Sequence, residues 1–269
     1  MVFRRELGSW LMLLARAGYV ARGVVYCLIG GLALLTALGA SRHAVGMKGA
    51  LLALIDEPLG QLLLIFLGLG FTGFAVWCLE QALFDSEQCG RSVAGLLQRA
   101  GKLGTAALHL GVVATVGRLL VGSSSSHLRD WSAWLLGYEF GPLVLGTVAL
   151  GVLAFGLGQA YRGLYAKLES RLRLDSLGPR SRRSLIEIAR FGLLIHGLVF
   201  ILIGTLLMAS ALRADPYETK GIGGALAALQ RQAYGRWLLA LVAAGLTAFG
   251  LYQLLLARYR RITTAPDKL

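Results

Sequence analysis

The run GVVYCLIGGLALLTALGAS, residues 23–41, contains no charged side chain. A helix that crosses the hydrocarbon core of a bilayer needs about 20 mostly apolar residues, which is the length of this run. Five further runs of this kind follow, at 58–79, 103–128 (interrupted only by Arg118), 140–161, 191–212 and 237–257. None alternates apolar and polar residues as a transmembrane β-strand would. The sequence therefore predicts an all-α, integral membrane bundle of six transmembrane helices.

The composition agrees with a membrane protein. Of the 269 residues, 56% are apolar and 15% are charged, and the mean hydropathy is +0.66. Soluble domains have about 45–50% apolar and about 25% charged residues, so the excess of apolar side chains must face lipid. These figures exclude a disordered chain, a disulfide-stapled secreted module and most soluble enzymes. In a membrane protein, the basic residues behind the net charge of +13 are used first to predict which segments are cytoplasmic. No nucleic-acid partner is expected.

The basic residues are distributed unequally between the two sides of the predicted bundle. With six spans, both termini share one side with the segments 80–102 and 162–190, and that side carries 19 Lys and Arg against seven on the other. Positively charged segments stay in the cytoplasm, so we expect both termini there, in a bacterial cytoplasmic membrane. The expected partners are the bilayer, its anionic headgroups at the cytoplasmic face, and an unidentified membrane protein. The densest basic cluster comprises Arg171, Arg173, Arg180, Arg182 and Arg183.

Internal repetition is the strongest pattern in the chain. Residues 15–38 and 189–212 are identical at eleven of 24 positions, and a weaker middle copy matches best at its end. We predict a single membrane domain, 1–269, made of three hairpin repeats at about 10–85, 96–168 and 186–262. Because each repeat contains two spans, all three are expected to have the same orientation, which gives a pseudo-threefold bundle. The middle copy has Thr105 and Ala106 where the first has Arg22 and Gly23.

Glycines and connecting segments give the expected packing. Gly23 and Gly30 lie seven residues apart, as do Gly197 and Gly204, so each pair shares a helix face on which the hairpin can pack closely. The connections near 50–55, 131–135 and 225–229 have apolar residues at helical spacing, which predicts short amphipathic helices at the extracytoplasmic interface. Hairpins 1 and 3 are expected to superpose more closely on each other than either does on hairpin 2.

The glycine motifs resemble those of a known family. These motifs are an Arg-x-Gly start, a Gly-x-x-Tyr/Phe-x-x-x-Gly span, as from Gly23 to Gly30, and a closing Gly-x-x-x-Phe-Gly, as from Gly151 to Gly156. In this respect the chain is similar to the bacterial domain-of-unknown-function family 1206. The resemblance covers almost the whole chain and implies three copies of a two-helix transmembrane unit. It brings no activity, ligand or catalytic residue.

The sequence contains no GxSxG, HExxH or Walker motif, so we expect no enzyme and name no catalytic or metal-binding residue. The candidate ligand-binding residues lie within the spans and are Arg22, Tyr26, His109 and His196. Gln159 and Gln253 are equivalent intramembrane polar positions, for which an interhelical hydrogen bond is the simplest interpretation. No cofactor is expected, and haem held by His109 and His196 is a weaker alternative.

Two functions stay open at this point. One is a non-enzymatic structural, interaction or accessory membrane protein, and the other is a transporter or channel for a small solute, anions included. A structural protein would pair its intramembrane polar residues locally between hairpins, whereas a conduit would aim them at one wet path. The direction of the Arg22 side chain helps to distinguish these two functions. Arg22 either snorkels to the headgroups, or it joins His196 in a polar cytoplasmic vestibule that could receive a solute.

Overall fold

The computed structural model describes residues 2–40, 46–55, 57–85, 89–122, 131–166, 168–172, 178–213 and 221–260. Within these ranges the fold is all-α. The long helices are α1 (Val2–Ala37), α3 (Gly60–Phe84), α4 (Val93–Leu120), α6 (Gly141–Tyr165), α7 (Pro179–Arg213) and α9 (Gly235–Tyr259). Each of these six is long and apolar enough to cross a membrane. The short helices α2 (Met47–Ile55), α5 (Trp131–Leu136) and α8 (Gly221–Gln230) connect them in pairs, as the sequence predicted.

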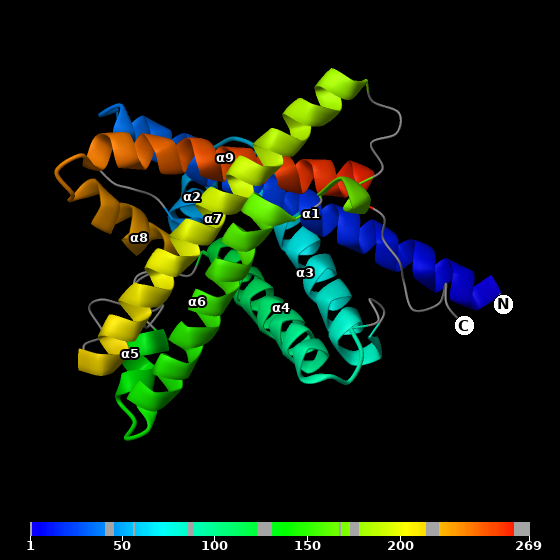
Figure 1. The fold of residues 1–269 in the computed structure, drawn as a ribbon, viewed down its shortest axis with the longest axis horizontal. Helices are drawn as coiled ribbons and strands as arrows, with labels where there is room; N and C mark the ends of the chain where they lie inside the picture. The colour runs from blue at the N-terminus through cyan, green and yellow to red at the C-terminus, as the bar shows by residue number, and fades with distance from the viewer. Residues whose placement is uncertain are drawn as a thin grey trace.

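Helix α1 is much longer than the apolar run that predicted it. The first span was expected to begin at Gly23, but α1 begins at Val2 and continues through Arg16 and Arg22. A charged side chain does not end a helix, since it leaves the backbone hydrogen bonds intact. The 36 residues of α1 extend about 54 Å at 1.5 Å per residue, well beyond a hydrocarbon core of about 30 Å. Figure 1 shows the N-terminal end of α1 projecting past the other helices.

Three pairs of long helices make the most extensive contacts in the bundle. They are α3 with α4, α6 with α7, and α9 with α1 (Figure 1). Each pair joins the second long helix of one repeat to the first long helix of the next, and the third repeat returns to the first. Each repeat therefore contacts both of the others.

Glycine allows two of these pairs to approach backbone to backbone. A Cβ added to Gly197 would lie 2.7 Å from the carbonyl oxygen of Gly156, and one added to Gly250 would lie 2.8 Å from that of Gly23. The prediction that these glycines pack the two helices of one hairpin was wrong. Their partner helices belong to the neighbouring repeat, because Gly18 and Gly192 occupy the face that meets the second helix of their own repeat, at Phe74 and Phe249.

The third pair, α3 with α4, replaces the glycines by alanines. Ala75 aligns with Gly156 and Gly250, Ala106 aligns with Gly197 and Gly23, and both alanines are buried. Two methyl groups at this crossing keep the backbones farther apart than two glycines do, so this contact is the least extensive of the three.

The middle repeat does not close on itself. In repeats 1 and 3 the two long helices meet where Gly70 packs on Ala21 and Gly245 packs on Ile195. The equivalent positions of repeat 2 are Gly151 and Gly104, and neither has a neighbour within 4 Å among the described residues. Extensive contact between α4 and α6 is accordingly absent from the described part of the chain. The bundle is an arc in the order α4, α3, α1, α9, α7, α6, open between its ends.

Candidate functional site

His196 lies at the centre of a polar network inside the bundle. Its side chain on α7 is 0% exposed. The Nε2 atom is 3.0 Å from the hydroxyl of Tyr26 on α1, and Nδ1 is 3.4 Å from the amide nitrogen of Gln159 on α6. The ring stacks on Phe249 of α9, with the centroids 3.7 Å apart and the planes inclined by 18°. One histidine thus contacts the three other helices around it.

The hydrogen-bond partners of Gln159 determine the tautomer of His196. The Gln159 side-chain oxygen accepts a hydrogen bond from Arg162 at 3.2 Å, so its amide nitrogen faces the histidine as a donor. Nδ1 of His196 must then accept, and in the neutral ring the proton is on Nε2, which donates to the Tyr26 oxygen. The donors run in one direction, from Arg162 through Gln159 and His196 to Tyr26.

Arg22 continues the network on the side of α1 that meets α9. With the Gln253 amide oriented so that its oxygen faces Arg22, this oxygen accepts from Nε at 3.1 Å and from Nη2 at 3.0 Å. The guanidinium carbon also lies 4.9 Å from the ring centroid of Phe74 and 5.9 Å from that of Phe249. Arg22 therefore points into the bundle instead of snorkelling. Its neighbours are an amide oxygen, the Tyr26 hydroxyl and ring faces, and no carboxylate is among these partners.

The structure does not bring His109 into this network. Its Nδ1 atom is 2.6 Å from the carbonyl oxygen of Thr105 one turn earlier on α4. Its ring lies beside Phe71 and Phe74, with centroids 5.5 and 4.9 Å away. Phe74 is thus a neighbour that His109 shares with Arg22. Of the four candidate residues, the structure joins Arg22, Tyr26 and His196 and leaves His109 outside their hydrogen-bonded network.

These positions do not fit the haem alternative. An axial haem ligand needs an imidazole nitrogen that is free to bind iron. Both ring nitrogens of His196 face protein partners, so His196 cannot supply the second of the two axial ligands that this alternative requires. In the described part of the chain, no group of three or more His, Cys, Asp or Glu side chains could hold a metal ion.

The contact between α3 and α4 has its own polar pair. The ammonium of Lys102 donates to the Gln81 side-chain oxygen at 2.5 Å and lies 5.5 Å from the ring centroid of Trp77. Each of the three contacts between repeats therefore contains a glutamine that accepts from a cationic side chain or donates to a histidine. The sequence identified Gln159 and Gln253 as polar positions inside the membrane, but Gln81 and Lys102 were missed. Both were placed in the cytoplasmic segment 80–102, where Lys102 served only as one of the basic residues that predict the topology.

A further cation fixes the end of α9. Arg260 donates a hydrogen bond to the hydroxyl of Tyr19, and its guanidinium carbon lies 5.4 Å from the Tyr19 centroid and 4.9 Å from that of Trp77. Burial lowers the pKa of Arg260 to about 10, so the group stays cationic at neutral pH. From the sequence, Arg260 was used only as one of the basic residues that predict the topology. In the structure it joins the end of α9 to Tyr19 of α1 and Trp77 of α3.

Part of the basic cluster is paired within the chain. Arg182 lies 2.7 Å from a carboxylate oxygen of Glu169, and Arg183 lies 2.9 Å from one of Glu187. These pairs are exposed, where ion pairs contribute at most about 1 kcal/mol, so they do not prevent contact with lipid headgroups. Arg173 lies outside the described residues.

Comparison with known proteins places the chain in a family. The family described as Domain of Unknown Function (DUF1206) matches residues 17–85, 100–166 and 191–260. The chain belongs to this family. Its three matched segments coincide with α1 to α3, α4 to α6 and α7 to α9, so the resemblance drawn from the glycine motifs is confirmed.

A curated relative of this DUF1206 chain covers nearly its full length. It is the "Uncharacterized protein YxxB" of Bacillus subtilis (strain 168), which is 32% identical over 262 residues, 97% of this chain and 95% of the relative. No solved structure matches the chain. The DUF1206 chain is thus a multi-pass membrane protein with a bacterial homologue.

Proposed function

We propose that the chain is a non-enzymatic structural or accessory protein of the bacterial cytoplasmic membrane. The observation that supports this proposal is the placement of its intramembrane polar groups. Gln159 with His196, Gln253 with Arg22, and Gln81 with Lys102 form pairs across the three contacts between repeats. Polar groups that bond helix to helix stabilise a fixed assembly.

A conduit would need these same groups to face water. His196 is 0% exposed and both of its nitrogens are engaged, and Gln253 is 2% exposed. Interhelical hydrogen bonds in membranes contribute about 0.6 kcal/mol on average and up to about 1.7 kcal/mol. Three such contacts between repeats favour a structural role for the network.

The topology is part of the proposal. Both termini are placed in the cytoplasm, with the three repeats in the same orientation and α2, α5 and α8 at the extracytoplasmic interface. The basic-residue distribution supports the first point, and the even number of spans per repeat supports the second. Trp134 on α5 is exposed and makes an edge contact with Tyr138, as side chains of an aromatic belt do.

Transport of a small anion is the second candidate. It is favoured by the guanidinium of Arg22, which lies inside the bundle against an amide oxygen and two rings. A cation without a carboxylate among these partners could hold an anionic solute.

One experiment separates the two functions. The full chain is reconstituted into liposomes loaded with chloride or inorganic phosphate, and efflux is compared with that of protein-free liposomes. A structural protein gives no added efflux, and Arg22→Gln lowers its thermal stability. Efflux that Arg22→Gln abolishes without changing the melting temperature would instead establish the transporter. Arg183→Gln, which changes an exposed arginine, is the matched control for lost charge.

A further inference from the structure

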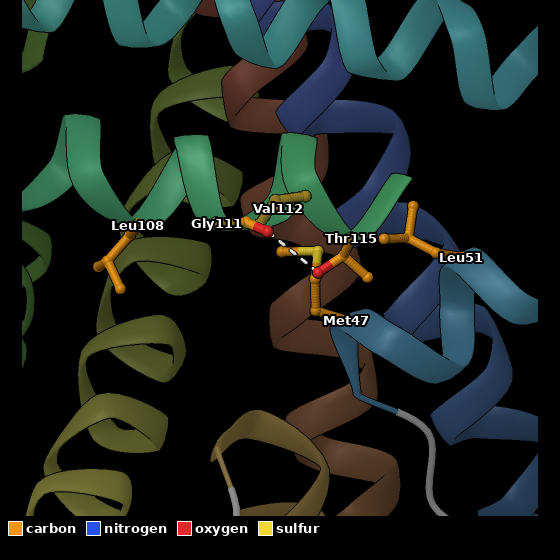
Figure 2. Close-up of a pocket in the computed structure, with 6 residues that line it drawn as sticks. All are labelled: Met47, Leu51, Leu108, Gly111, Val112 and Thr115. Carbon is orange, nitrogen blue, oxygen red and sulfur yellow. Dashed lines mark hydrogen bonds between the residues drawn. The ribbon is translucent and has the colours of Figure 1, made fainter. Parts of the chain in front are cut away.

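We propose that the chain binds one phospholipid between α2 and α4, with an acyl chain in the hollow that these helices form and the phosphate on Arg118. The hollow has a volume of about 220 Å³ and is lined by Met47, Leu51, Leu108, Gly111, Val112 and Thr115. Figure 2 shows Met47 and Leu51 of α2 near Gly111 and Thr115 of α4. The Thr115 hydroxyl donates to the Gly111 carbonyl oxygen at 3.0 Å, so this polar group is satisfied within its own helix.

The hollow exists because repeat 2 lacks side chains that the other repeats supply. Gly111 aligns with Leu28 of repeat 1 and Leu202 of repeat 3, both of which pack against the core. A Cβ at Gly111 would meet nothing within 4 Å. An apolar cavity of about 150 Å³ already takes up a benzene molecule, so a space of this size has room for several methylene groups.

The same helix face is exposed at Leu108 and Gly111. Leu108 is 67% exposed, whereas its equivalents Val25 and Val199 are 0% and 2% exposed. An exposed leucine in the middle of a membrane-spanning helix contacts lipid chains, because they are the solvent there. The hollow therefore lies where an acyl chain is already present.

Arg118 identifies the headgroup end. It lies in the last turn of α4, is exposed, and makes no salt bridge within the described residues. Leu108, Thr115 and Arg118 follow one another at helical spacing on one face. At 1.5 Å per residue, Arg118 is about 15 Å from Leu108 along the helix, half of a hydrocarbon core of about 30 Å. A lipid whose phosphate meets Arg118 can thus extend its chain along the hollow to the middle of the bilayer.

The two parts of the site have different roles. The acyl chain and the protein surface are equally apolar, so packing in the hollow fixes where the acyl chain lies and supplies the smaller part of the affinity. A guanidinium and a phosphate form charge-assisted, bidentate hydrogen bonds, which supply most of the affinity. An anionic lipid such as phosphatidylglycerol is therefore the expected occupant, in the leaflet on the side of α2.

Native mass spectrometry of the purified full chain, titrated with phosphatidylglycerol in detergent, tests this proposal. Wild type is expected to retain one lipid, and Arg118→Gln should weaken its retention by about 10- to 100-fold, since a hydrogen bond to a charged group contributes about 1.5–3 kcal/mol. Arg118→Lys keeps the charge and should retain part of the binding. Gly111→Leu fills the hollow with the residue found in the other repeats and should lower retention several-fold.

Gly158→Leu is the matched control, because it changes an α6 glycine at which an added Cβ would meet nothing within 4 Å. It should leave retention unchanged, and melting temperatures confirm that each variant is folded. Equal retention by wild type, Arg118→Gln and Gly111→Leu would overturn the proposal. A wild-type dimer that Gly111→Leu dissociates, with lipid retention unchanged, would also overturn it and make this face a contact between copies.

Discussion

Gly197→Ala tests the close approach of α6 and α7. The added Cβ would lie 2.6 Å from the backbone nitrogen of Ala160 and 2.7 Å from the carbonyl oxygen of Gly156. Comfortable contacts between carbon atoms are about 3.5–4.0 Å, and backbone atoms cannot rotate away as a side chain can. The two helices must therefore separate, which also lengthens the 3.4 Å contact between Gln159 and His196.

The magnitude follows from two opposing effects. Overpacking of a well-packed site costs about 1–3 kcal/mol, whereas alanine stabilises a helix interior by up to about 1 kcal/mol over glycine. We expect Gly197→Ala to lower the free energy of unfolding by up to about 2 kcal/mol relative to wild type, and by about 1–3 kcal/mol relative to an alanine substitution that meets no neighbour. Reversible unfolding of the full chain in mixed detergent and SDS micelles measures this value.

The matched control is Gly158→Ala on α6, where the added methyl group meets nothing within 4 Å. Its stability should equal or exceed that of wild type. If Gly197→Ala is as stable as Gly158→Ala, the backbone contact between these repeats does not hold the bundle together, and the argument from glycine is refuted.

Three further outcomes are expected. His196→Phe can keep the ring stack on Phe249 but leaves the buried Gln159 amide nitrogen without its acceptor and removes the donor to the Tyr26 hydroxyl, so it should cost about 1–3 kcal/mol in the same unfolding assay; wild-type stability would contradict the network. Arg260→Gln removes two cation–π contacts and should cost about 0.5–2 kcal/mol. Because burial lowers the pKa of Arg260 to about 10, the folded state loses this proton first, and wild type should gain stability relative to Arg260→Gln above that pH; parallel pH profiles would refute this. Alkaline phosphatase fused after the C-terminus should be inactive, and high activity would reverse the topology.

Much of the fold could be predicted from the sequence because its determinants are local in the chain. Charge-free apolar runs predicted six long helices, and repeated glycines predicted three copies. The helical spacing of these glycines predicts which residues share a helix face, but it does not predict which other helix packs against that face. Gly23 and Gly30 were for this reason assigned to the wrong partner, and α9 occupies the place expected for α3.

The opening of repeat 2 depends on an absence of side chains that no local pattern reveals. Gly104 stands where repeat 1 has Ala21 and repeat 3 has Ile195, so nothing on α4 reaches Gly151. Helix α4 can form with glycine or with a larger residue at position 104. The loss of contact between α4 and α6 becomes apparent only when the two helices are placed together.

The candidate site was predicted in part. Alignment of the repeats put Arg22 and His196 at equivalent positions, and both now bond a glutamine from a different repeat. The pairing itself could have been found, because Gln159 and Gln253 each lie four residues after the phenylalanine of the closing motif. The stacking of Phe249 on His196 depends on contacts between helices far apart in the chain.

The central claim is that polar side chains inside the membrane hold neighbouring repeats together, and a double-mutant cycle on Arg22 and Gln253 tests it most directly. Arg22→Met, Gln253→Leu and the double variant are unfolded under the same conditions as wild type. The account predicts a favourable coupling free energy of about 0.6–1.7 kcal/mol, the range of interhelical hydrogen bonds in membranes. Additive effects, with a coupling within about 0.3 kcal/mol of zero, would contradict it.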